Sequence, residues 1–299
     1  MGILEKLEKC DLCPRNCKVN RLKGQKGFCG AVGENVKQAR IGLHYYEEPC
    51  ISGNSGSGTV FFSGCNLRCQ FCQNYTISQE ETGREISIQE LADKMIWLQE
   101  EGANNINFVT GFMYIPQIIE SIRIAKTQGL KIPILYNSSG YESVEALKML
   151  EGYIDIYLPD FKYYYEELAT RLSNAKNYKS IAMSAIKEMI RQQPENIYDE
   201  DGILQKGVII RHLVLPNHIQ NSKQVLKFLK STFGKNISIS IMAQYFPSYK
   251  ASEIKDINRK LTKKEFEEIE DYLYRLEFKN GYIQYLEENE EQYVPDFDS

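Results

Sequence analysis

Histidine is scarce in this sequence, and long apolar runs are missing. Only three histidines occur in 299 residues, which argues against a metal site built on imidazole nitrogens. No segment approaches the roughly 18 consecutive apolar residues of a membrane span. Residues 1–11 carry charges every few positions and lack the apolar stretch of a signal peptide. We therefore expect a cytoplasmic protein without a membrane partner.

A clear excess of one charge sign is also missing. The chain has 40 acidic and 36 basic residues, a formal charge of −4, and both signs are mixed along most of the sequence. Nucleic acids and anionic lipids select strongly basic surfaces, so neither is an expected partner. The apolar fraction of 42% is sufficient for a sizeable core in a chain of this length.

Cysteine is absent from residues 73–299, although the first quarter of the chain is rich in it. Stabilising disulfides would be distributed over the whole fold, so this clustering argues against them. Thiolates two or three residues apart converge readily on one soft metal centre. The sequence therefore predicts metal or cluster ligands among Cys10, Cys13, Cys17, Cys29, Cys50, Cys65, Cys69 and Cys72.

Short apolar runs that alternate with longer amphipathic stretches predict β-α units and a parallel sheet. Six such units make an α/β fold, a partial (β/α)6 barrel, whose active site collects at the carboxyl ends of the strands. The expected strands are Gly58–Ser63, Ile106–Thr110, Ile132–Asn137, Ile154–Leu158, Val208–Leu215 and Ile237–Met242. The expected helices lie near Ile88–Glu101, Ile115–Gln128, Ser143–Leu150, Tyr164–Leu172, Ile181–Gln192, Ser222–Ser231 and Thr262–Phe278.

Three segments are expected along the chain. Residues 1–54 are rich in Cys, Lys and Gly and do not follow the β-α period, so we interpret them as a small metal-binding extension. Residues 55–284 form the barrel. Residues 285–299 are an acidic tail, in which Tyr293, Val294 and Phe297 are the side chains able to dock on a surface.

The strongest motif follows the first expected strand. Cys65, Cys69 and Cys72 form a Cys-x3-Cys-x2-Cys array, one thiolate fewer than a closed cluster or a structural zinc site requires. A cubane with one iron free of cysteine has an open coordination position, as a catalytic metal site needs. The alternatives are a zinc site and buried free thiols.

This array, with Phe71 before the last cysteine, resembles the signature of the radical S-adenosylmethionine (SAM) superfamily. The resemblance implies that Cys65, Cys69 and Cys72 hold a [4Fe-4S] cluster and that the open iron binds SAM. An electron delivered through the cluster then splits SAM into methionine and a 5′-deoxyadenosyl radical, which abstracts a hydrogen atom from a substrate.

The chain is also similar to iron–sulfur homologues of pyruvate formate-lyase activating enzyme. This resemblance implies an electron donor such as flavodoxin or ferredoxin, and a glycyl-radical enzyme as the substrate. The same radical chemistry on a peptide or small metabolite, and a non-catalytic iron–sulfur or zinc protein, remain alternatives. The matching stretches are Cys13–Cys17, Glu48–Gly53, Gly56–Thr59, the cysteine array, Asn137–Tyr141, Pro159–Tyr163, Arg211–Pro216 and Gln244–Tyr245.

Most expected site residues come from these matches. In activating enzymes an Asp-x-Lys element lies beside SAM, which implies catalytic and SAM-binding roles for Asp160 and Lys162. Arg211 either grips the methionyl carboxylate with two hydrogen bonds or belongs to a structural ion pair. His212 points away from Arg211, toward the core or a helix. The expected SAM-binding set is Phe71, Thr110, Asn137, Ser139, Asp160, Lys162, Arg211 and Gln244.

One departure concerns the SAM amino group. Many superfamily members hold it with a Gly-Gly-Glu element after the second strand, whereas this chain has Val109-Thr110-Gly111-Phe112 there. Thr110, or backbone carbonyls around Gly111, would take that role.

The earlier cysteines Cys10, Cys13, Cys17 and Cys29 supply four thiolates within 20 residues, which predicts a closed tetrathiolate site. Thiolates alone do not distinguish zinc from a second iron–sulfur cluster. The cluster loading that the neighbouring site requires favours the second cluster slightly. Cys50 is left over, either as a substitute ligand or as a small buried residue.

Overall fold

The computed structural model describes residues 2–285 and 297. Its centre is a ten-stranded sheet that does not close on itself, as a partial barrel requires. Neighbouring parallel strands follow in the order β2 (Ser57–Phe62), β4 (Ile106–Val109), β5 (Ile134–Ser138), β6 (Ile156–Pro159), β8 (Leu204–Leu213), β9 (Ser238–Met242) and β10 (Asn280–Gln284). The expected α/β fold is confirmed, and each of the six expected strands overlaps an observed one.

Four strands were not expected. β1 (Val36–His44) is antiparallel to β2, and β3 (Arg84–Ile86) is antiparallel to β1. β7 (Ile197–Tyr198) pairs with β8, and β10 lies at a sheet edge with only a few apolar residues. Because β1 belongs to the main sheet, this sheet begins within residues 1–54, the segment interpreted as an extension. The domain boundary at residue 54 itself stays a prediction.

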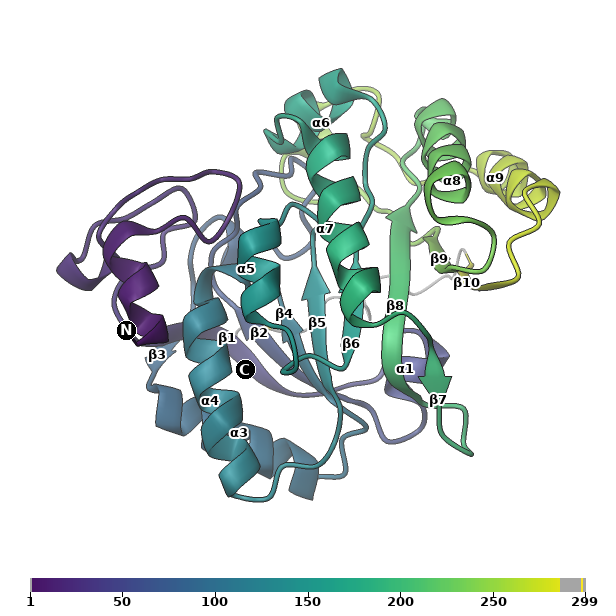
Figure 1. Cartoon of the computed structure of the whole chain (residues 1–299). Helices are drawn as coiled ribbons and strands as arrows, with labels where there is room; N and C mark the ends of the chain where they lie inside the picture. Colours follow the sequence, from purple (N-terminus) through teal and green to yellow (C-terminus); the bar gives the residue numbers. More distant parts are fainter. Residues whose placement is uncertain (1, 286–296, 298–299) are drawn as a thin grey trace.

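Long helices cover one face of the sheet, and α4, α5 and α7 lie in front of it in Figure 1. At two helix starts the expected capping signals are present. Ser87 Oγ accepts the backbone N–H of Glu90, and Thr262 and Glu265 form a reciprocal capping box. The helices are α3 (Ile88–Glu100), α4 (Ile115–Thr127), α5 (Val144–Met149), α6 (Glu166–Ser173), α7 (Tyr178–Gln192), α8 (Ile219–Phe233) and α9 (Lys263–Arg275).

Shorter helical turns connect the other elements. They are α1 (Pro49–Ser52), α2 (Tyr75–Ser78) and the 3-10 turns Ile3–Lys9, Arg21–Lys23, Phe112–Tyr114 and Ala251–Glu253. Within the described residues, no helix is long and apolar enough to cross a membrane.

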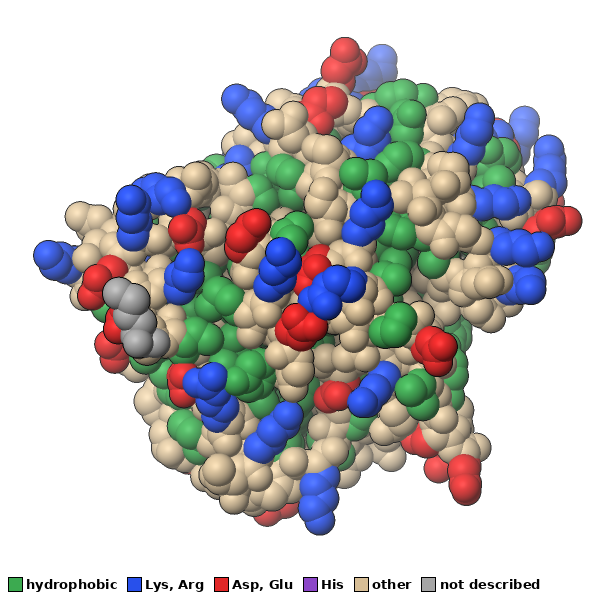
Figure 2. Space-filling model, in the orientation of Figure 1, with side chains coloured by type: hydrophobic (Ala, Val, Ile, Leu, Met, Phe, Trp, Pro, Cys, Tyr) green, Lys and Arg blue, Asp and Glu red, His purple; other side chains and the backbone are tan. Residues whose placement is uncertain are grey.

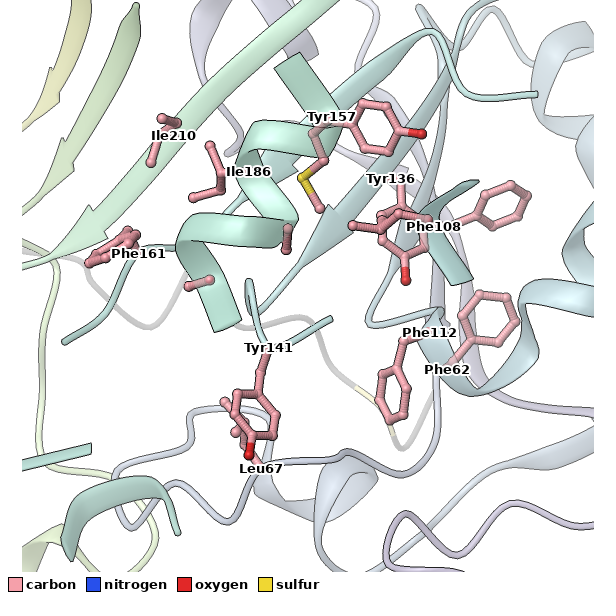
Figure 3. Close-up of a cluster of buried hydrophobic side chains, with 14 of the residues drawn as sticks. Phe62, Leu67, Phe108, Phe112, Tyr136, Tyr141, Tyr157, Phe161, Ile186 and Ile210 are labelled. Carbon is pink, nitrogen blue, oxygen red and sulfur yellow. The ribbon is translucent and has the colours of Figure 1, made fainter. Parts of the chain in front are cut away.

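Alternate strand residues divide the interior into two cores, because successive side chains on a strand point to opposite faces. On the helix side, Phe62, Phe108 and Tyr136 belong to the large core, and Figure 3 shows them close together. On the other face, Leu135 and Ile156 pack in a smaller core with Cys50, Ile51, Leu158, Leu204 and Ile209. The sheet is therefore buried on both faces, which explains the nearly continuous apolar strands.

The expected tail lies mostly outside the described residues. Of its candidate docking residues, Phe297 is described, and its ring packs edge-on against Phe61 with 5.5 Å between ring centroids. On the face shown in Figure 2, acidic and basic side chains are interspersed, in agreement with the mixed charge of the sequence.

Candidate functional site

The loop after β2 carries the three-cysteine array, and other parts of the chain hold it on both sides. Gly64 has a φ of +94°, and a Cβ atom there would lie 2.3 Å from the carbonyl oxygen of Cys29. On the other side, the backbone N–H groups of Arg68 and Gln70 donate to carbonyl oxygens at the end of α6, at 3.0 and 2.8 Å. The loop is thus fixed between the N-terminal segment and α6.

Each sulfur of the array has a polar neighbour. The backbone N–H of Leu67 lies 3.4 Å from Cys65 Sγ, and Ser78 Oγ lies 3.2 Å from Cys72 Sγ. Ser173 Oγ donates to Cys69 Sγ at 3.0 Å, while its own oxygen is 2.6 Å from Tyr163 Oη. Hydrogen-bond donors of this kind stabilise sulfur that carries ligand charge, so the loop suits a metal-bound cluster.

Burial raises the pKa of all three thiols, that of Cys72 to about 11. Lys162 opposes this effect at Cys69, because its positive charge favours a thiolate. The free thiols are therefore protonated at neutral pH, and a bound metal would displace their protons.

The array opens into a cavity of about 250 Å³ at the carboxyl ends of the central strands. All the side chains expected around SAM line this one cavity, so the structure brings the expected set together. They are Phe71, Thr110, Asn137, Ser139, Asp160, Lys162, Arg211 and Gln244. Their roles stay predictions.

Asp160 and Lys162 form an ion pair at the cavity wall, with 18% of each side chain exposed. Although burial opposes its charge, the carboxylate of Asp160 raises the pKa of Lys162. Tyr178 Oη accepts the backbone N–H of Lys162 at 2.9 Å and donates to the Ser139 carbonyl oxygen at 2.8 Å. The phenol thereby ties the ends of β5 and β6 together and fixes this ion pair over the cavity.

Arg211 is buried and paired with two carboxylates that the sequence analysis did not identify. Its Nε donates to Glu48 Oε1 at 2.8 Å, and its Nη2 contacts both Glu47 and Glu48. Glu47 Oε1 also accepts from Asn107 and Asn137, at 3.0 and 3.3 Å. Arg211 is therefore in an ion pair, while a contact with the methionyl carboxylate stays a prediction.

Glu47 places a carboxylate in the cavity of a chain that has no Gly-Gly-Glu element. Thr110, the expected substitute, lies at the cavity wall with a φ of 58°, an uncommon conformation for a β-branched residue that is often found at functional sites. Glu48 belongs to one of the matched stretches, Glu48–Gly53. Nothing in the sequence around Glu47 and Glu48 indicated that either carboxylate would be buried beside Arg211.

His212 lies on the opposite face of β8 from Arg211. Its ring nitrogens are 2.7 Å from the Phe161 carbonyl oxygen and 2.8 Å from Ser222 Oγ of α8. Burial lowers its pKa to about 4, so the ring is neutral. The expectation of a helix-facing histidine is confirmed.

The four earlier cysteines line a second, much smaller cavity. In the thiol form, and among the described residues, no set of three or more His, Cys, Asp or Glu side chains is arranged to hold a single metal ion. This holds equally for Cys65, Cys69 and Cys72, so metal binding at either group requires the sulfurs to converge.

Several curated proteins are similar in sequence. The uncharacterized protein MJ0674 of Methanocaldococcus jannaschii is 36% identical over 88% of this chain and 72% of its own length. A pyruvate formate-lyase-activating enzyme of Listeria monocytogenes is 26% identical over 56% of this chain and 66% of that enzyme. The corresponding enzyme of Clostridium pasteurianum is 27% identical over 40% of this chain and 52% of that enzyme.

Two solved structures show the same fold at low identity. A spore photoproduct lyase variant matches with a TM-score of 0.50 and 10% identity, over 75% of this chain and 74% of that one. The FeFe-hydrogenase maturase HydG from Carboxydothermus hydrogenoformans matches with a TM-score of 0.50 and 16% identity, over 75% and 52%. At these identities the likeness is one of fold.

The family model described as the radical SAM superfamily matches residues 59–199, which include the three-cysteine array and the ends of β4, β5 and β6. Together with the relative of 36% identity, this match agrees with the site geometry. The chain belongs to the radical SAM superfamily.

Proposed function

We propose that this protein cleaves SAM reductively at a [4Fe-4S] cluster held by Cys65, Cys69 and Cys72. The observation that carries the proposal is that three cysteines, and not four, open into a cavity with several polar side chains at the carboxyl ends of parallel strands. Superfamily membership implies both the cluster and SAM. When bound, such a cluster supplies the electron that splits the sulfonium of SAM and yields a 5′-deoxyadenosyl radical.

The charges around the cavity suit a cationic ligand. The carboxylates of Glu47 and Asp160 and the cations of Lys162 and Arg211 line the cavity. A third carboxylate, that of Glu48, is not part of the lining but is buried against Arg211, so the group as a whole has one more negative charge than positive. His44, which also lines the cavity, does not add charge at neutral pH because burial lowers its pKa. The excess negative charge favours a sulfonium with a protonated amino group.

Polar side chains at the cavity wall can contact this ligand. The Asp160–Lys162 pair offers an acceptor and a cation at the cavity wall, and Asn137 and Ser139 offer further donors and acceptors from the end of β5. We assign Asp160 and Lys162 to the positioning of SAM. Lys162 also adds positive charge beside Cys69, which favours the ligand form of that sulfur.

For the substrate we propose a backbone glycine of a partner protein, from which the radical takes the α-hydrogen. Support comes from the similarity to two pyruvate formate-lyase-activating enzymes. The electron would come from a small redox protein such as flavodoxin or ferredoxin. A peptide or small-metabolite substrate would rest on the same cavity and the same radical chemistry.

Anaerobic reconstitution tests the proposal. The wild type, loaded with iron and sulfide, is expected to release 5′-deoxyadenosine when reductant and SAM are added. The Cys65→Ala, Cys69→Ala, Cys72→Ala variant should release none, whereas Cys50→Ser, a buried thiol in the smaller core, should behave as wild type. A loaded wild type that releases none, with or without a glycyl-radical enzyme present, would support a non-catalytic iron–sulfur protein instead.

A further inference from the structure

The four cysteines of the N-terminal segment face one small enclosed space. Cys10, Cys13, Cys17 and Cys29 all line it, and the other walls are mainly apolar, formed by Leu12, Val19, Phe28, Ala31, Phe112 and Met113. Four thiolates complete a tetrahedral shell without an open position, which is the arrangement of a structural metal site.

A buried arginine indicates the charge of the occupant. Arg21 lines the same space with 1% of its surface exposed. One of its nitrogens, Nη1, donates to the Met113 carbonyl oxygen, but Nε and Nη2 have no hydrogen-bond partner within the part of the chain that is described. A buried guanidinium with unpaired N–H groups is costly unless an anion lies nearby. A dication bound by four thiolates carries two negative charges and would compensate it.

Backbone N–H groups hydrogen-bond three of these sulfurs. The N–H of Phe28 donates to Cys17 Sγ at 3.4 Å, and the N–H groups of Arg15 and Ala31 donate to the sulfurs of Cys13 and Cys29. Both of the latter donors lie two residues after their cysteine, as Leu67 does after Cys65. The N-terminal segment therefore repeats a local feature of the cluster loop.

The size of the space distinguishes one ion from a cluster. Its free volume is about 10 Å³, close to the roughly 10–15 Å³ that a single water requires. The cavity at the three-cysteine array has about 250 Å³. The larger cavity has to hold SAM as well as a cluster, so the comparison rests on the N-terminal space itself, whose small free volume favours one ion.

The segment also contacts the cluster loop directly. Arg15 Nε donates to the Asn66 carbonyl oxygen at 2.9 Å, and Arg68 donates to the carbonyl oxygen of Phe28. Both guanidinium groups lie over the ring of Phe28, at 3.9 and 4.2 Å from its centroid. Metal binding by Cys17 and Cys29, which flank Phe28 in sequence, would fix Phe28 and through it the cluster loop.

We propose that Cys10, Cys13, Cys17 and Cys29 bind one Zn²⁺ ion, and that this zinc site braces the loop of Cys65, Cys69 and Cys72. Zinc is chosen over a second iron–sulfur cluster because of the small free volume. From the sequence, a second cluster was slightly favoured, because the neighbouring site already requires iron–sulfur loading. Arg21 acts as a positioning residue that balances the charge of the tetrathiolate. Zinc binding at this site does not itself require SAM cleavage.

Metal analysis of a variant without the radical cluster tests the site. In the Cys65→Ala, Cys69→Ala, Cys72→Ala background, purified without oxygen from medium that contains zinc and iron, we expect one zinc per chain and no iron. Adding Cys13→Ser and Cys17→Ser should remove the zinc, whereas adding Cys50→Ser should not. Bound iron and sulfide in place of zinc would overturn the choice of metal, and a chain without either metal would overturn the site.

A measurement on the wild type covers the case in which these variants do not fold. X-ray absorption at the zinc edge should show four sulfur ligands at about 2.3 Å, and oxygen or nitrogen ligands would contradict the proposal.

To test whether the zinc site stabilises the cluster loop, zinc is removed with a chelator and amide hydrogen exchange is measured for residues 63–74. We expect faster exchange in this loop and unchanged exchange in α9, and an unchanged loop would overturn the brace. Neither readout depends on SAM. A failure of the zinc site can therefore be told apart from a failure of the proposed SAM cleavage.

Discussion

The two groups of cysteines differ in number and in the free space beside them. The array after β2 has three thiols beside a polar cavity of about 250 Å³, whereas the N-terminal group has four around an apolar space of about 10 Å³. The backbone N–H of Leu67 and the side-chain hydroxyls of Ser78 and Ser173 contact the array, while the backbone N–H of Phe28 contacts the N-terminal group. An open shell with room for a ligand permits reaction, and a closed shell without room permits only structure.

The largest effect should come from removing one ligand at each group. Cys72→Ser is expected to lose the iron bound at the three-cysteine array and to stop release of 5′-deoxyadenosine, because the cluster has no spare ligand. Cys29→Ser should lose zinc but keep most of the iron, with a rate lowered by roughly tenfold, as for loss of a supporting contact. Iron, zinc and 5′-deoxyadenosine are measured on the same samples. Equal loss of activity in both variants would break the distinction.

Gly64 joins the two groups and gives the next largest effect. Its Cβ would lie 2.3 Å from the Cys29 carbonyl oxygen at a φ of +94°, so Gly64→Ala should destabilise the fold by roughly 2–4 kcal/mol. Gly102→Ala is the matched control, since Gly102 has a φ of +87° and open space around it, with an expected cost of about 1 kcal/mol. Chemical denaturation measures both, and equal costs would show that the contact with Cys29 is unimportant.

Phe28→Leu removes the ring between two guanidinium groups and keeps an apolar side chain. Loss of both cation–π contacts should cost about 1–2 kcal/mol and should increase protease cleavage within residues 63–74. Trp97→Leu serves as control, because Lys94 lies over this more exposed ring at 5.1 Å. If Phe28→Leu leaves cleavage of the loop unchanged, the stacked arginines do not brace it.

The smallest effect should appear in the cluster potential. Ser173→Ala deletes the hydroxyl that donates to Cys69 Sγ at 3.0 Å, and loss of a hydrogen bond to a ligand sulfur lowers the reduction potential, here by on the order of tens of millivolts. Ser184→Ala on α7, whose hydroxyl donates to the Ser180 carbonyl oxygen, should not change it. Redox titration followed by electron paramagnetic resonance gives the values. A higher potential in Ser173→Ala would contradict this role.

Local periodicity predicted the central strands because each is a short apolar run buried on both faces, as Ile106–Val109 is. The site set of Asp160, Lys162 and Asn137 was also predicted, since polar residues that follow parallel strands meet at one edge of the sheet. β10 was missed because an edge strand needs little apolar sequence, and Asn280–Gln284 has little.

The buried acids were missed for a different reason. Glu47 and Glu48 lie after β1, 164 and 163 positions before Arg211, so their contacts with it form only in the assembled fold. Acidic residues are usually solvated, so sequence alone favours the surface. The unpaired Nε and Nη2 of Arg21 could not be predicted from the sequence either. Whether a buried N–H group has a hydrogen-bond partner depends on the assembled fold.

The two walls of the cluster loop are made at very different times during synthesis. Phe28, which Arg68 contacts, precedes it by 40 positions, whereas Ser173, which contacts Cys69, follows it by 104. Chains emerge from the ribosome N-terminus first, so the N-terminal wall is available as a template when the loop appears. The wall from α6 is synthesised later, so Cys69 acquires its Ser173 contact only after the N-terminal contact of Arg68 can form.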